Sequence, residues 1–172
     1  MSNTELARKM QEVHAQIQKL DTNSALSVLN ERLLVETDPL FAIEMKITKA
    51  KLLQSLGHWQ EAVDLLEECT KNPRANESAA YFAAEILVEN GRLTDAVDFL
   101  QRAERQIEEN GSTYYENCIF LLHAFCEAKK ARHGLAKHLL DKVTDEETAL
   151  IWLQTDSVIS VFAVKELIAK GG

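Results

Sequence analysis

The sequence predicts an all-α fold of helices joined by short loops, and three observations carry this prediction. Six of the 172 residues are Gly and two are Pro. Together they make up about 5% of the chain, whereas average usage would give about 12%. A β-sandwich or barrel needs a turn every 8–12 residues or so, drawn largely from Gly, Pro, Asn and Asp. No segment alternates with period two for long enough to predict a strand. Apolar residues instead recur three and four positions apart, which is typical of amphipathic helices.

Turn and cap residues divide the first half of the chain into four predicted helices. Asp38-Pro39 marks a helix start, because Asp can cap the N-terminus and Pro suits the first helical position. Gly57 marks a helix end, since Gly takes the left-handed conformation without steric cost. Asn72-Pro73 closes the fourth helix. The predicted helices span 4–20, 24–37, 39–56 and 59–71.

Six further helices are predicted in the second half, and two of them begin at apparent capping boxes. Thr113 is followed three residues later by Glu116, and Thr144 is followed in the same way by Glu147. In this pattern the two side chains satisfy each other's exposed backbone amides. The predicted helices begin at residues 76, 93, 113, 132 or 133, 144 and 156 or 157. The ninth is expected to run through residue 152, and the tenth to end before residue 171.

A repeat of 34 residues lies in the middle of the chain, where LLQSLGHWQEAVDLLEEC aligns with ILVENGRLTDAVDFLQRA. Small residues in this pattern let two antiparallel helices approach closely, and Gly permits a tight turn between them. The matched positions are Ala50 and Ala84, Leu53 and Leu87, Gly57 and Gly91, Trp59 and Leu93, Ala62 and Ala96, Leu66 and Leu100, and Cys69 and Ala103.

The core G-x-[WL]-x2-A-V-D-[LF]-L resembles the tetratricopeptide repeat family, strongly over residues 40–108 and loosely over 4–143. In the loose part, Ala136 and Leu140 fit helix B of a last repeat, and Ala131 stands where the turn Gly is expected. The resemblance implies a right-handed α-solenoid of antiparallel helix pairs in one domain, 1–172. The implied repeats are 4–37, 40–73, 76–109 and 113–143, followed by a C-terminal helical cap over 145–170.

Composition and motifs exclude several classes of function. The net charge of −8 argues against a nucleic-acid or anionic-membrane binder, which needs clustered Lys and Arg. No apolar run approaches the roughly 20 residues of a membrane span, and residues 1–20 lack the apolar core of a secretory signal. Three cysteines without C-x-x-C spacing indicate reduced thiols in a cytoplasmic protein.

The sequence carries no recognisable catalytic or metal-binding motif, so we expect neither an enzyme nor a cofactor. The histidines and cysteines of the second half invite comparison with a metal site: Cys118, His123, Cys126, His133 and His138. His133 and His138 are five residues apart and do not share a helix face, so their spacing opposes it.

The family resemblance implies that a partner protein binds on a concave face lined by the first helix of each pair. Members that hold the acidic tails of chaperones use Lys, Asn and Arg there, but only Lys51 supplies a cation at those positions. The predicted face is instead apolar with acidic groups, suited to an apolar or amphipathic segment that carries Lys or Arg. The alternative is that these aromatic and Leu pairs form the core. The predicted contact residues are Lys51, Tyr81, Phe82, Glu85, Leu121, Leu122 and Phe125.

The C-terminal segment is apolar nearly all round, unlike a solubilising end cap, which needs a polar outer face. It is expected to be buried, to lie in the groove of its own chain, or to form a dimer or partner contact through Val158, Val161 and Phe162. The favoured function is a scaffold or chaperone-like adaptor. The alternatives are an inhibitor or immunity protein that occludes a toxin or enzyme, and a structural subunit that docks through this helix.

Overall fold

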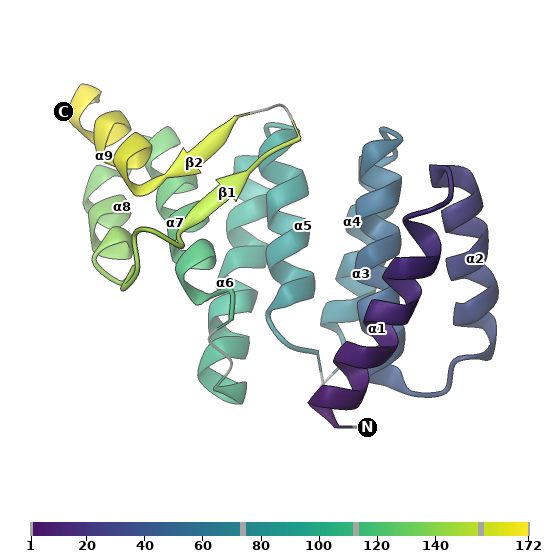
Figure 1. The fold of residues 1–172 in the computed structure, drawn as a ribbon. Helices are drawn as coiled ribbons and strands as arrows, with labels where there is room; N and C mark the ends of the chain where they lie inside the picture. The colour runs from purple at the N-terminus through teal and green to yellow at the C-terminus, as the bar shows by residue number, and fades with distance from the viewer. Residues whose placement is uncertain (1, 73–74, 112–113, 155–156, 172) are drawn as a thin grey trace. The chain divides into compact units, whose positions relative to one another are not determined.

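The computed structural model describes residues 2–72, 75–111, 114–154 and 157–171, and this part of the chain is mostly helical with one two-stranded sheet (Figure 1). The chain forms two compact units, unit 1 (1–75) and unit 2 (76–172). Their boundary falls between the second and third predicted helix pairs. The expectation of a single domain stays a prediction. No helix in the described residues is long and apolar enough to cross a membrane.

Unit 1 contains four helices, and the first three begin at side-chain caps. Asp21 accepts hydrogen bonds from the amides of Asn23 and Ser24, and Asp38 caps α3 in the same way. The Ser24 hydroxyl also donates to Asp21, and together with the amide bonds it lowers the pKa of that carboxyl; the amide bonds, from Phe41 above all, lower the pKa of Asp38. The helices are α1 (Asn3–Ile17), α2 (Thr22–Val35), α3 (Pro39–Ser55) and α4 (Trp59–Thr70). Helices α1, α2 and α3 share a core that includes Met10, Val13, Ile17, Ala25, Leu29, Phe41 and Met45.

Unit 2 consists of two helix pairs followed by a β-hairpin and a last helix. In each pair the first helix, α5 or α7, is buried along most of its length. Helix α7 also contacts α5, α6, the hairpin and α9, so it lies at the centre of the unit. The elements are α5 (Ser78–Glu89), α6 (Leu93–Asn110), α7 (Glu116–Lys129), α8 (His133–Leu140), β1 (Leu150–Trp152), β2 (Val158–Ser160) and α9 (Val161–Lys170).

The same turn joins the helices of three pairs, α3–α4, α5–α6 and α7–α8. Its central residue has a positive φ: +81° at Gly57, +72° at Gly91 and +58° at Ala131. The next amide donates to the carbonyl five residues earlier, which closes the end of the first helix. These donor–acceptor pairs are His58–Leu53, Arg92–Leu87 and Arg132–Glu127. The expectation that Ala131 takes the place of the turn Gly is therefore confirmed.

The predicted ninth helix is wrong, because residues 144–152 form a turn and strand β1. The Thr144 side chain does not cap a helix; its amide and hydroxyl both donate to Asn117 Oδ1. Asp145 instead accepts from the amides of Glu147 and Thr148 in a turn. The expectation that no strand would form is also wrong: β1 pairs with β2 in antiparallel register, with Ile151 opposite Ile159.

The predicted tenth helix begins later than expected, at Val161, where Ser160 caps it by accepting from the Ala163 amide. Three predicted signals lie outside the described residues, so the structure does not bear on them. They are Pro73 at the end of the fourth helix, Thr113 in the first capping box and Asp156 before the last helix.

Candidate functional site

Four of the predicted contact residues on α5 and α7 belong to the core of unit 2. Tyr81 and Phe82 are buried, and the Tyr81 ring stacks on Tyr115 with centroids 5.0 Å apart. Leu121 and Leu122 are fully buried. Burial, together with the nearby Glu85 carboxylate, raises the pKa of Tyr81. Because they are buried, these side chains do not form an open contact surface, which corrects the expectation that they line a groove.

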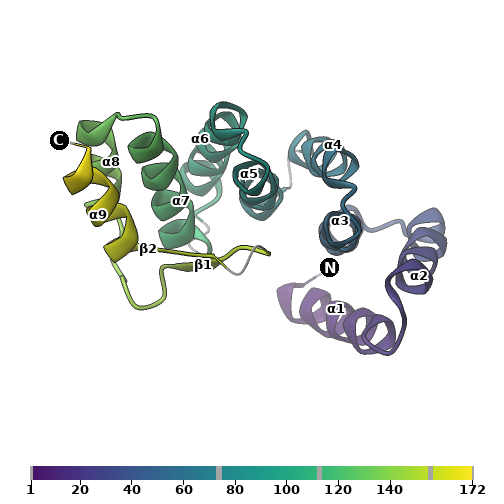
Figure 2. The same ribbon diagram turned by 90° about the horizontal axis from the view of Figure 1, so that it is seen from above.

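The other predicted contact residues are more accessible and are divided between the two units. Glu85 and Phe125 are half-buried in unit 2, whereas Lys51 is exposed in unit 1. The hairpin lies beside α7, on the side of α5 rather than of α6 (Figure 2). At its tip, the Gln154 amide donates to the Glu89 carboxylate of α5. The hairpin therefore covers part of the face on which a groove was expected.

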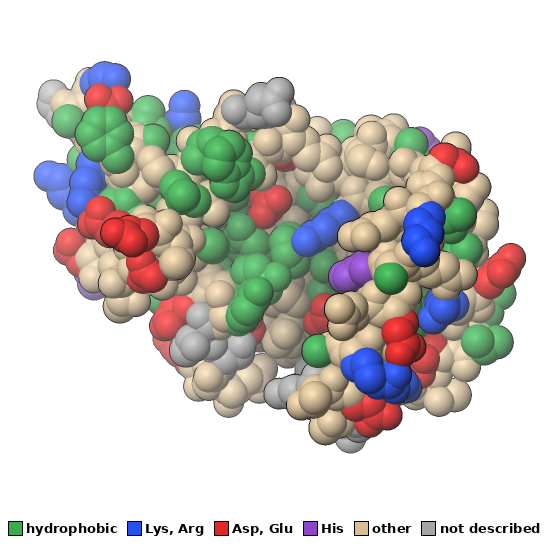
Figure 3. All heavy atoms as spheres, viewed as in Figure 1, with side chains coloured by type: hydrophobic (Ala, Val, Ile, Leu, Met, Phe, Trp, Pro, Cys, Tyr) green, Lys and Arg blue, Asp and Glu red, His purple; other side chains and the backbone are tan. Residues whose placement is uncertain are grey.

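The hairpin is apolar on both of its faces. Ile151 and Ile159 form its buried inner face, while Trp152 and Val158 pair across the strands on the outer face. Trp152 is 71% exposed. Figure 3 shows hydrophobic side chains gathered at the surface over the hairpin. We use the name hairpin face for the outer face together with the exposed Phe162, which lies two residues after β2 at the start of α9: Leu150, Trp152, Val158 and Phe162.

The predicted docking residues therefore separate into two groups. Val158 and Phe162 are exposed, as docking residues must be, whereas Val161 is buried in the core of unit 2. Sequence reasoning missed Leu150 and Trp152, because it assigned them to a helix. Whether this surface docks a partner stays a prediction.

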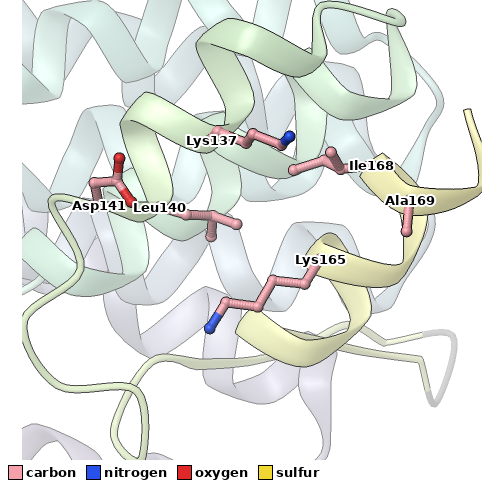
Figure 4. A pocket seen from close by; sticks show the side chains of 6 residues that line it. All are labelled: Lys137, Leu140, Asp141, Lys165, Ile168 and Ala169. Carbon is pink, nitrogen blue, oxygen red and sulfur yellow. The ribbon is translucent and has the colours of Figure 1, made fainter. Parts of the chain in front are cut away.

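A second candidate site is a cleft of about 530 Å³ between α8 and α9 (Figure 4). Lys165 of α9 lies on its edge, with Nζ 2.9 Å from Glu146 Oε1. The sequence signal for this site is the run KKARHGLAKHLLDK (129–142), which holds five Lys or Arg and one Asp in a chain of net charge −8. The residues lining the cleft are Lys137, Leu140, Asp141, Lys165, Ile168 and Ala169.

Two buried polar clusters join neighbouring segments of unit 2. His123 Nδ1 of α7 lies 2.5 Å from Glu104 Oε1 of α6, and both side chains are largely buried. The carboxylate of Glu127 is also buried, 3.4 Å from Lys130 Nζ and 3.4 Å from Arg132 Nη1. Each cluster pairs a carboxylate with a basic group inside the unit, which is the condition under which buried charge is tolerated.

Neither a metal centre nor a reactive thiol emerges from the described residues. They contain no group of three His, Cys, Asp or Glu side chains that could hold a metal ion. Burial raises the pKa of Cys69 to about 11 and that of Cys126 to about 12, and it also raises the pKa of Cys118. Such thiols stay protonated at neutral pH and are poor nucleophiles.

Comparison of the chain with protein-family models, with curated proteins and with solved structures finds no match.

Proposed function

We propose that this protein is a non-catalytic protein-interaction module and that the hairpin face of unit 2 is its contact surface. The observation that carries the proposal is that both faces of the hairpin are apolar. One face is used to pack on unit 2, and the other presents Trp152 and Val158 to solvent. Contiguous exposed apolar patches of this kind mark interaction surfaces in soluble proteins.

The composition of the hairpin face fits the centre of a protein–protein interface. Trp152 is 71% exposed and Phe162 is 70% exposed. Large aromatic side chains dominate the energetics of interfaces, and Trp is enriched among the residues that contribute most. Burial of one such ring contributes several kcal/mol, at about 25 cal/mol per Å² and 150–250 Å² a ring.

The surroundings of the hairpin face favour a partner that carries both apolar and basic groups. Asp145, Glu146 and Glu147 precede β1 and are all exposed. The chain as a whole has a net charge of −8. Complementary charge steers association and selects partners, so we propose an apolar or amphipathic segment flanked by Lys or Arg. The adaptor hypothesis and the structural-subunit hypothesis both take this form.

We also propose that the helix pairs are tetratricopeptide-like repeats, about four in number, in a right-handed α-solenoid. Two observations support this. The turns at Gly57, Gly91 and Ala131 share one geometry. Ala62, Ala96 and Ala136, at matching positions of α4, α6 and α8, are fully buried, as close helix packing requires. The described cysteines are free, which supports a cytoplasmic location.

The proposal is tested by placing a photoreactive amino acid at position 152 and irradiating cells that express the full chain. Leu34 provides the matched control, since it is 85% exposed but belongs to unit 1. We expect a cross-linked protein with the probe at 152 and none with the probe at 34. An adduct of twice the mass of the chain would identify a second copy as the partner.

The same partner should be lost from the double variant Trp152→Ser, Phe162→Ser and kept by Leu34→Ser. Both rings are exposed, so the far-ultraviolet circular dichroism of the double variant should match that of the parent. Equal cross-linking at 34 and 152, or full retention of the partner by the double variant, would contradict the proposal.

A further inference from the structure

The cleft between α8 and α9 has the size and walls of a small-molecule site. Its volume of about 530 Å³ falls within the range of about 300–1,000 Å³ typical of ligand pockets. Leu140 and Ile168 face each other across it from the two helices, each largely buried, and Ala169 completes the apolar wall (Figure 4). The interior therefore favours an apolar group.

Two lysines from different helices give the cleft its charge. Lys137 belongs to α8 and has no ion-pair partner among the residues that the structure describes. Lys165 belongs to α9. Among the described residues it forms an ion pair only with Glu146, whose side chain is 60% exposed. An ammonium group beside an apolar wall, paired at most with a solvated carboxylate, is available to an incoming anion.

The charged side chains that line the cleft are Lys137, Lys165 and Asp141. Two cations against one carboxylate make this lining basic in a chain of net charge −8, which favours an anion there over a cation. Glu146, one of the acidic residues before β1, pairs with Lys165, so an incoming anion has to displace it. None of the residues of the hairpin face lines the cleft.

We propose that the α8–α9 cleft binds a small organic anion, namely a carboxylate that carries an apolar chain. The carboxylate lies against the ammonium group of Lys137 and competes with Glu146 for Lys165. The chain packs on Leu140 and Ile168. An inorganic anion would gain nothing from the apolar wall, and an apolar cation would be repelled by the two lysines. The proposal does not depend on the function proposed for the hairpin face.

The test is a titration of the isotope-labelled full chain with decanoate, below its micelle-forming concentration, followed by amide chemical shifts. We expect shifts confined to α8 and α9. Acetate carries the charge without the chain, and decyltrimethylammonium carries the chain with the opposite charge. Neither should shift these amides at the same concentration.

The double variant Lys137→Gln, Lys165→Gln should bind decanoate about tenfold more weakly, which corresponds to about 1.4 kcal/mol. The matched control is Lys170→Gln, which removes an exposed α9 lysine that pairs with Glu166 and does not line the cleft. Its affinity should equal that of the parent.

Three results would overturn the proposal: no shifts with decanoate, shifts spread over the hairpin face as well, or equal affinity of the double variant and the parent. A fourth would replace it. If an acidic amphipathic peptide shifts the α8 and α9 amides and decanoate does not, the cleft holds a protein segment instead.

Discussion

Helix pairs α5–α6 and α7–α8 of unit 2 share one turn geometry but close it with different residues. The first pair has Leu87 and Gly91, whereas the second, 40 residues later, has Glu127 and Ala131. A buried carboxylate thus replaces a buried Leu, and an alanine takes a backbone conformation that favours glycine. The small residues at the packing positions and the turn hydrogen bonds are common to both pairs. We expect the second pair to form the turn at a cost in stability.

The largest expected difference between the pairs lies at a matched Leu of their second helices. Leu100 of α6 is fully buried, whereas Leu140 of α8 borders the open cleft. Removing a buried Leu side chain costs about 2–5 kcal/mol, and more where the cavity cannot collapse. We expect Leu100→Ala to lower the free energy of unfolding by about 4 kcal/mol and Leu140→Ala by about 2 kcal/mol, measured by urea denaturation. Equal losses would show that the two pairs are packed equally well.

The buried carboxylate of Glu127 gives the next effect. Lys130→Gln with Arg132→Gln leaves this carboxylate without its two cations, and we expect a loss of about 1–3 kcal/mol, since Arg132 is partly solvated. Glu127→Leu, which copies Leu87, should be neutral or stabilising.

The control for this comparison is Arg92→Gln in the first pair, because Arg92 pairs with the partly exposed Asp95. It should change the free energy of unfolding by less than about 1 kcal/mol. If Glu127→Leu destabilises as much as removal of both cations, the ion pairs stabilise the unit and a buried Leu does not replace them.

Exchanging the turn residues should change the stability of the protein in opposite directions for the two pairs. Ala131→Gly relieves the left-handed strain and should stabilise the protein by about 0.5–1 kcal/mol, after the entropic cost of Gly. Gly91→Ala should destabilise it by about 1 kcal/mol. No atom lies within 4 Å of a Cβ added at Gly91, so this loss would come from the backbone alone. Thermal melting of both variants distinguishes the signs.

The smallest effect concerns pH and Cys126, which takes the place of Ile86. Burial raises the pKa of Cys126 to about 12, whereas an unfolded thiol ionises near about 8.5. Between these values the unfolded chain releases a proton that the folded chain keeps, so stability falls as pH rises. From pH 7 to pH 8.5 the fall should be smaller in Cys126→Val than in the parent, by about 0.4 kcal/mol. Identical falls in both proteins would contradict this.

Most helix boundaries could be predicted because their signals are local. Asp38-Pro39, Gly57 and Gly91 act through their own backbone preferences. The hairpin could not be predicted in this way. Strands of three residues with two apolar faces show no alternation and are read as buried helix. The Thr144 side chain bonds to Asn117, 27 residues away, and no local pattern contains that contact.

The candidate site was predicted less well than the fold, because exposure depends on what packs against a helix. The run SAAYFAA (78–84) carries no charge and is buried throughout. Seven uncharged residues span about two helical turns, which indicates a helix buried on every side. The sequence therefore contains the signal for this burial. The exposure of Trp152 could not be predicted from the sequence, since it depends on which face of a short strand packs on α7.

Each unit contains one of the two tryptophans of the chain, and the two rings lie in different surroundings. Trp59 is half-buried at the start of α4 in unit 1, and Trp152 is exposed on β1 in unit 2. Intrinsic fluorescence therefore resolves the units without any added label. With Trp59 replaced by Phe, the remaining emission reports on unit 2 alone, and docking on the hairpin face should shift it to the blue. With Trp152 replaced by Phe, the emission follows unit 1 through its own unfolding transition.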